Sequence, residues 1–308
     1  MKRCSNNPVI TPALSACIGE NINGPSVLET PDWLPNRLGR YYLYFASHGG
    51  QHIRLAYADA IEGPYRIYEP GALHIRDTPF RSHIASPDVH IDHDRRCVWM
   101  HYHGHPIPGS PWPQPTCYAE SPDGLAFRSD ATPVGPSYLR TFRLGDLHYG
   151  LSGGGRRRWY RGPDPRARFE EGPLLEIEGE TFPPLPEVRG AGPSGVYRMR
   201  HVGLWRDGDR LWVYYSNVGD TPERIKRTVV DLTDDWSSWR GAPFEEVLAP
   251  EQPWEGGRLS LEPSRSGAAR APVRQLRDPY LFETDGRRWL FYVVAGEFGI
   301  AIAELATD

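Results

Sequence analysis

Long apolar runs are missing from this chain of 308 residues. No stretch approaches the ~18 consecutive apolar residues that a membrane-spanning helix needs, so we expect no membrane partner. The segment from Met1 to Leu14 has no apolar core, and we expect no signal peptide. Four cysteines form no CxxC pair and predict no disulfide framework: Cys4, Cys17, Cys97 and Cys117. These shortages favour a reduced, cytoplasmic setting.

Lysine is also scarce, since Lys2 and Lys226 are the only two, and the formal net charge is −4. This balance argues against a nucleic-acid partner. A sustained helical stripe is absent too, because apolar residues at i, i+3, i+4 and i+7 never persist for three turns. What is abundant is Gly and Pro, 63 residues together, and Trp and Tyr, 26 together. Frequent turns between aromatic segments predict an all-β fold of short strands.

The aromatic segments recur at equivalent places in a repeated unit of three or four antiparallel strands. Tyr41 to Ala46, Val98 to Tyr102, Leu211 to Tyr215 and Trp289 to Val294 each occupy its second strand. Five copies predict one domain over residues 1–308, a single five-bladed β-propeller, and a two-sheet sandwich is the alternative. We expect blades near 20–70, 80–130, 135–175, 195–248 and 273–308, with long Pro- and Gly-rich loops at 106–115, 163–193 and 250–272.

A propeller brings the starts of its innermost strands and the hairpins between second and third strands to one face. These positions hold many charged and polar residues, which predicts a site at the mouth of the central channel. The candidate catalytic carboxylates are Asp88, Asp278, Glu223 and Glu297. The candidate substrate-binding residues are Asn23, His48, His103, Arg140, Arg200, His201 and Arg277. The alternative is a structural ring of ion pairs that closes the propeller.

Two further motifs carry weaker signals. The run from Gly153 to Arg158 is similar to a phosphate loop but lacks the Lys-Ser/Thr ending, so we interpret it as a hairpin, with anion binding as the alternative. His101, His103 and His105 alternate at strand spacing and would face one side, so a pair of them binding a metal ion is an alternative. Because Gly104 and Pro106 indicate that the strand ends there, we expect no metal and no cofactor, with a channel cation such as calcium as the alternative.

The starts of three blades carry a resemblance to a known family. They read Asn23-Gly24-Pro25-Ser26, Ser86-Pro87-Asp88-Val89-His90 and Arg277-Asp278-Pro279. Together with the strand pair before Gly63-Pro64-Tyr65, the sequence resembles the five-bladed glycoside hydrolases of the arabinanase and β-xylosidase type, family 43 and its relatives. The resemblance covers nearly the whole chain at the level of blades.

That resemblance implies an inverting glycosidase with a base Asp on blade one, a pKa-tuning Asp on blade two and an acid Glu on blade three. Asp88 matches the tuning position. The base position before Pro25 is Gly24, and blade three opens with Arg140 and Thr141 instead of Glu. We therefore take Asp278 as a displaced base, and Glu223 and Glu297 as candidate acids.

Three functions stay open at this point. The first is a glycosidase-like enzyme that hydrolyses a small glycoside or oligosaccharide with carboxylate acid and base groups at the channel mouth. The second is a non-hydrolytic enzyme, a phosphorylase or lyase, because an Arg-rich mouth suits an anionic sugar or phosphate. The third is a carbohydrate-binding propeller without catalysis. All three predict a small carbohydrate as the partner.

Overall fold

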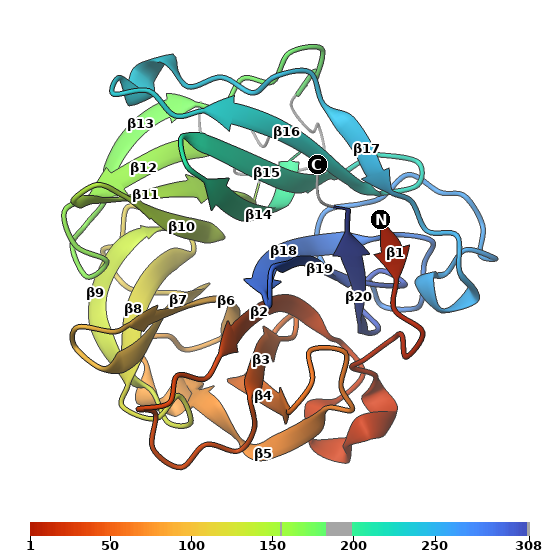
Figure 1. The fold of residues 1–308 in the computed structure, drawn as a ribbon, viewed down its shortest axis with the longest axis horizontal. Helices are drawn as coiled ribbons and strands as arrows, with labels where there is room; N and C mark the ends of the chain where they lie inside the picture. The colour runs from red at the N-terminus through yellow and green to blue at the C-terminus, as the bar shows by residue number, and fades with distance from the viewer. Residues whose placement is uncertain (155, 183–198, 307–308) are drawn as a thin grey trace.

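A computed structural model describes residues 1–154, 156–182 and 199–306 of the chain. Five antiparallel sheets of four strands each surround a central channel (Figure 1), which confirms the predicted five-bladed β-propeller. The innermost strand of each sheet borders the channel: β2, β6, β10, β14 and β18. Residues 195–198 of the predicted fourth blade lie outside the described residues.

The first three blades follow one another in chain order. Blade one consists of β2 (Asn23–Glu29), β3 (Tyr41–Ala46), β4 (His52–Ala58) and β5 (Arg66–His74). Blade two consists of β6 (His83–Asp92), β7 (Cys97–His105), β8 (Pro115–Ser121) and β9 (Arg128–Pro136). Blade three consists of β10 (Leu139–Leu144), β11 (Leu147–Ser152), β12 (Arg158–Gly162) and β13 (Glu170–Leu174).

The last two blades close the ring. Blade four consists of β14 (Met199–Asp207), β15 (Arg210–Asn217), β16 (Ile225–Asp231) and β17 (Glu245–Leu248). Blade five consists of β18 (Arg277–Thr284), β19 (Arg287–Val293), β20 (Ile300–Leu305) and, from the other end of the chain, β1 (Lys2–Arg3). No sequence pattern predicts β1, because a two-residue strand is too short to have one.

One predicted loop is partly wrong. The sequence predicts an irregular loop over 163–193, but β13 lies within it and pairs with β12. Pro173 is tolerated there because β13 is the outer edge of its sheet, where one side of the strand needs no backbone partner. Residues 183–193 of the predicted loop lie outside the described residues.

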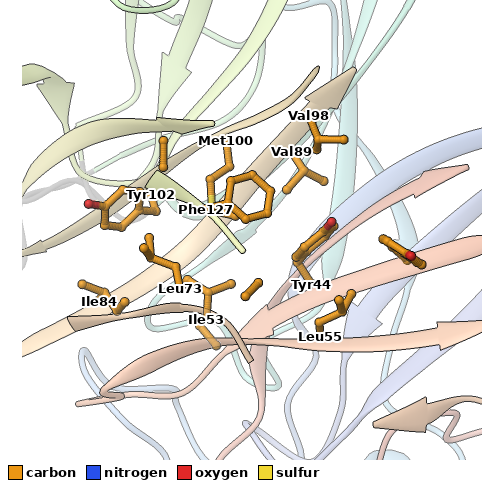
Figure 2. Packing of buried hydrophobic residues seen from close by; sticks show 14 of the residues in the cluster. Tyr44, Ile53, Leu55, Leu73, Ile84, Val89, Val98, Met100, Tyr102 and Phe127 are labelled. Atoms are coloured by element: carbon orange, nitrogen blue, oxygen red, sulfur yellow. The ribbon is translucent and has the colours of Figure 1, made fainter. Parts of the chain in front are cut away.

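The hydrophobic core consists of five clusters, and each lies between two neighbouring blades. Figure 2 shows the cluster between blades one and two, where Tyr44, Ile53 and Leu55 face Val89 and Met100. Because every sheet buries both faces against its neighbours, the strands read as continuous apolar runs, as in Tyr41–Ala46, where all six residues are buried. This packing fixes the channel-facing strands as a rigid frame.

Helices contribute little to this architecture. The described residues contain five 3₁₀ turns: η1 (Pro12–Leu14), η2 (Ala16–Ile18), η3 (Ile75–Asp77), η4 (Trp236–Ser238) and η5 (Pro253–Glu255). None of the helices in the described ranges has the length and apolar character to cross a membrane.

Candidate functional site at the channel mouth

In four blades a residue in the left-handed backbone region lies near the start of the inner strand. These residues are Gly24, Ser86, Tyr138 and Asp278, with φ between 49° and 60°. In blades one, two and five this residue and the proline after it form a bulge, as the register shifts beside Asn23, Ala85 and Arg277 show. A bulge re-aims side chains without breaking the sheet. The four positions therefore surround the same end of the channel.

A cavity of about 170 Å³ lies at this mouth. Five of the predicted site residues line it: Asn23, His48, His103, His201 and Glu297. Six others do not: Asp88, Asp278, Glu223, Arg140, Arg200 and Arg277. The remaining lining residues are Gly49, His83, Ala85, Ser86, Gln114 and Tyr138.

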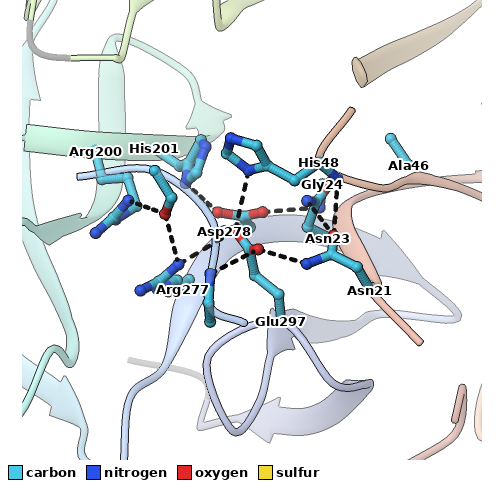
Figure 3. A network of polar contacts seen from close by, with 12 residues as sticks. Asn21, Asn23, Gly24, Ala46, His48, Arg200, His201, Arg277, Asp278 and Glu297 are labelled. Carbon is cyan, nitrogen blue, oxygen red and sulfur yellow. Dashed lines mark hydrogen bonds and ion pairs between the residues drawn. The ribbon is translucent and has the colours of Figure 1, made fainter. Parts of the chain in front are cut away.

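Asp278 lies directly behind His201 and is 2% exposed. One carboxylate oxygen pairs with Nδ1 of His201, and the other accepts a hydrogen bond from the Gly24 amide at 2.8 Å (Figure 3). Burial alone would raise the pKa of Asp278, but His201, the Gly24 amide and Arg277 together lower it to about 2. Asp278 is thus an ionised carboxylate that fixes the orientation of the imidazole in front of it.

Glu297 is the second carboxylate at the mouth. Its Oε2 accepts hydrogen bonds from Asn21 at 2.6 Å and from the Ala269 amide at 3.1 Å, and its Oε1 lies 3.2 Å from Arg277 and 3.5 Å from Nδ1 of His48. Burial opposes ionisation, but His48, Arg277 and Asn21 together lower the pKa of Glu297. Figure 3 shows His48 beside Glu297 and His201 beside Asp278. Two imidazole–carboxylate pairs therefore meet at one cavity.

Two further imidazoles line the cavity in neutral form. His103 is 1% exposed, and neither of its ring nitrogens has a hydrogen-bond partner among the described residues. Burial and the neighbouring His83 hold its pKa well below the usual value. Burial also lowers the pKa of His83, and a hydrogen bond between its ring and Gln114 opposes that shift. These rings add polar contacts to the cavity without adding positive charge.

The three candidate arginines bind protein groups instead of facing the cavity. Arg200 makes a two-pronged pair with Glu223 at 2.8 and 3.1 Å. Arg277 binds Gln275 and Glu297 and lies 3.6 Å from Glu223. Arg140 crosses the channel from blade three, donates to the carbonyls of Pro87 and Pro25, and lies 3.5 Å from Asp88. The contacts of these three arginines fit the alternative interpretation, a structural network of ion pairs.

Two of the predicted carboxylates lie away from the cavity. Glu223 is fully buried between Arg200, Arg277 and Ser216. Asp88 accepts hydrogen bonds from His90 at 2.9 Å and from the amide and hydroxyl of Thr141 at 2.9 and 3.0 Å. Burial is opposed by His90 and Arg140, which lower the pKa of Asp88 to about 2. Both side chains have their oxygens occupied by protein donors.

The sequence did not single out three lining residues: His83, Gln114 and Tyr138. Gln114 lies between the second and third strands of blade two, where the rule used for His103 also applies. Tyr138 lies directly before the inner strand β10, near a strand start as Asp278 does, but a left-handed backbone has no sequence signature in an aromatic residue. Within the described ranges, no group of three or more His, Cys, Asp or Glu side chains is arranged to hold a metal ion.

No family model matches the sequence. The fold is similar to that of solved glycoside hydrolases at low sequence identity. A family-43 enzyme from Xanthomonas citri in complex with xylose has a TM-score of 0.63 at 14% identity, with 98% of this chain and 90% of that chain covered. A family-43 β-xylosidase/α-arabinofuranosidase from a compost metagenome, in complex with xylotriose, has 0.64 at 13%, with 100% and 96% covered. An α-L-arabinanase from Cellvibrio cellulosa, complexed with arabinohexaose, has 0.53 at 12%, with 94% and 93% covered.

These likenesses confirm the resemblance in fold to the five-bladed hydrolases. A closer relative in sequence is "Uncharacterized protein R118" of Acanthamoeba polyphaga mimivirus, which is 38% identical over 306 residues, with 92% of this chain and 83% of the viral protein covered. Identity at this level over nearly the full length of the propeller establishes kinship and not only a shared fold. The chain belongs to the family of five-bladed propeller proteins that includes this mimivirus protein.

Proposed function

We propose that the protein is a glycosidase-like enzyme that hydrolyses a small glycoside in the cavity at the channel mouth. The observation that carries the proposal is that two imidazole–carboxylate pairs, His201–Asp278 and His48–Glu297, converge on one cavity. Glycoside hydrolysis needs one group that activates water and one that protonates the leaving oxygen. Histidine can serve in either role near neutral pH.

His201 is the base in this proposal. In the neutral ring whose Nδ1 donates to Asp278, the lone pair lies on Nε2, where it can accept a proton from water. Asp278 does not line the cavity, so it acts through His201 and is a positioning residue. The carboxylate that the family resemblance places on blade one is thus supplied from blade five, and the Gly24 amide binds it at 2.8 Å.

His48 is the acid. Glu297 accepts four contacts and its pKa is lowered, so it is ionised and has no proton to donate. The His48 ring beside it is 42% exposed and can exchange protons with solvent between turnovers. The acid role expected of Glu297 therefore passes to its partner.

The substrate in this proposal is an uncharged sugar. Arg140, Arg200 and Arg277 are bonded to protein groups and lie outside the cavity lining, which removes the argument for an anionic sugar or phosphate. A volume of about 170 Å³ is small compared with the ~300–1,000 Å³ of sites for drug-sized ligands. Xylose and xylotriose occupy solved structures of the same fold, so pentosides are the first compounds to test.

The experiment is a turnover assay of the purified protein on 4-nitrophenyl pentosides and hexosides, with D-xylose and inorganic phosphate tested as ligands by calorimetry. We expect turnover of one glycoside and its loss in His201→Ala. His93 lines a different cavity, at the opposite end of the channel. The variant His93→Ala is therefore the control and should keep full activity.

A carbohydrate-binding propeller without catalysis is the second candidate, and a specific observation favours it. Among the residues that the structure describes, no carboxylic acid with a raised pKa lines the cavity, whereas two-carboxylate glycosidases need one. Sugar binding that is abolished in His201→Ala, without turnover of any glycoside, would select this function over the enzyme. Binding of phosphate in place of sugar would contradict both.

A further inference from the structure

The glycine hairpin between β11 and β12 is hydrogen-bonded to the backbone beside the site. The Gly153 amide donates to the carbonyl of Tyr138 at 3.0 Å, and the Gly154 amide donates to the carbonyl of Arg200 at 2.5 Å. Tyr138 lies just before β10, and Arg200 is the residue before His201. The hairpin therefore joins the starts of blades three and four at the cavity.

Gly154 leaves room for the ring of Tyr138. A Cβ atom at position 154 would lie 2.5 Å from Cδ2 and 2.9 Å from Cε2 of Tyr138. Contacts that short do not occur between real side chains, so any residue with a Cβ would displace the ring. Gly154 also has φ of 61°, a region that L residues rarely adopt.

Tyr138 itself has φ of 57°, which is uncommon for a bulky residue and costs backbone free energy. A turn that needed only this backbone shape would favour Gly or Asn. The ring instead lies between two site imidazoles, with centroids 4.3 Å from His103 and 4.6 Å from His201. A strained backbone persists where the surrounding contacts hold the residue in place, and such positions are concentrated at functional sites.

Tyr138 lines the cavity, and no described residue accepts a hydrogen bond from its hydroxyl. Burial and the nearby charge of Asp278 raise its pKa, so the phenol keeps its proton throughout the pH range of the protein.

We propose that Tyr138 is a positioning residue, which clamps the imidazoles of His201 and His103 and donates a hydrogen bond from its hydroxyl to an oxygen of the bound sugar. Gly154 leaves the room that the ring occupies, and the Gly153 amide binds the carbonyl of Tyr138. The hydroxyl part rests on the proposed function, whereas the clamp does not.

The clamp is tested by NMR of the histidine side chains in the full-length protein, without any ligand. Gly154→Ala and Tyr138→Ala should shift the imidazole resonances of His103 and His201. Gly145→Ala is the matched control: Gly145 lies in the other hairpin of blade three at φ of 59°, but its added Cβ would meet nothing within 4 Å. Both glycine variants suffer the same backbone strain, so only ring displacement separates them.

Equal resonances in Gly154→Ala and Gly145→Ala would overturn the clamp. If Gly154→Ala fails to fold, Tyr138→Leu, which removes the aromatic ring with less loss of volume, provides the same test. The clamp is supported if the imidazole resonances of His103 and His201 shift in the Tyr138 variants and stay in place in Gly145→Ala.

The hydroxyl is tested with Tyr138→Phe, which keeps the ring. We expect the His103 and His201 resonances to stay in place, while D-xylose binding and kcat/KM on 4-nitrophenyl β-D-xylopyranoside fall by about tenfold, the usual weight of one hydrogen bond. Unchanged binding and turnover would overturn the donor role. Absence of both in the unmodified protein would contradict the proposed function, and the resonance test of the clamp would still stand.

Discussion

At the scale of single residues, the site depends on which residue occupies the left-handed position near the start of each inner strand. Gly24, Ser86, Tyr138 and Asp278 share this conformation at the starts of four inner strands. Blade one carries no side chain there, and blade five carries a carboxylate whose oxygen binds the Gly24 amide at 2.8 Å. Near-symmetry of the blades thus lets a carboxylate reach the same place from a different strand.

Asp278→Asn should lower kcat by a factor on the order of 10²–10⁴, because the amide cannot stabilise the protonated form of His201 and disturbs its tautomer. Substrate binding should be retained, since Asp278 does not line the cavity. Steady-state kinetics on the glycoside identified in the turnover assay measure the change. A folded variant with full specific activity would make Asp278 a blade-closing residue instead.

Asp88 predicts acid sensitivity. Its pKa is lowered from 3.8 to about 2 in the folded protein, against the effect of burial, by His90 and Arg140. A depressed folded pKa stabilises the protein above the unfolded value, and this contribution is lost as pH falls from about 4 to about 2. The shift corresponds to ~2 kcal/mol. Urea unfolding across this range should show a smaller loss in Asp88→Asn than in the unmodified protein, and equal slopes would refute the assignment.

At the scale of elements, the inner strands approach one another closely and small residues permit it. Gly203 on β14 lies against β18 of the next blade, where a Cβ would be 2.5 Å from the carbonyl oxygen of Pro279 and 2.9 Å from Leu281. The outer strands β5, β9 and β13 also carry prolines, which fit there because one side of an edge strand needs no backbone partner.

Gly203→Ala should therefore reduce the free energy of unfolding by about 1–3 kcal/mol, the usual cost of overpacking. Gly135→Ala on the outer strand β9 is the matched control, because its added Cβ would meet one flexible leucine tip at 3.1 Å. Thermal and urea unfolding of the two variants measure the difference, and equal stability would show that β14 and β18 can separate without cost.

At the scale of the whole molecule, the N-terminus closes the ring. β1 pairs with β20, the third strand of blade five, so the two ends of the chain share one sheet. Arg3 on β1 binds fully buried Glu255 at 2.8 and 3.1 Å and the carbonyl of Ala249 at 3.0 Å. Tyr292 also donates to Glu255 at 2.9 Å. Closure thus joins β1 to the loop between blades four and five.

Arg3→Ala should destabilise the protein by about 3 kcal/mol, because it leaves a buried carboxylate without its cation. Lys2→Ala, the exposed neighbour on the same strand, should change stability little. In an Glu255→Gln background the effect of Arg3→Ala should shrink, since no buried charge remains. Urea unfolding of the four proteins measures this coupling, and additive effects would show that the pair does not stabilise the closure.

The amino-acid sequence by itself determined the blades. Short aromatic strands between turns, repeated five times, are local patterns. The strand Tyr41–Ala46 lies where the pattern predicted it, and Arg287–Val293 covers all but the last residue of the predicted Trp289–Val294. The same repeat predicted which face holds polar residues, and Asn23, His48, His103, His201 and Glu297 do line one cavity. Periodicity suffices for this because strand direction alternates in every blade.

Only the tertiary structure decided what each polar group binds. Arg200 and Glu223 look like site residues in the sequence but neutralise each other in the interior, and Asp278 faces His201 from another blade. β1 and the position of Tyr138 were also invisible, since a two-residue strand and a strained aromatic have no local signature. Partners such as Asp278 and Gly24 are 254 residues apart, and their pairing depends on ring closure, which brings the first and last blades together.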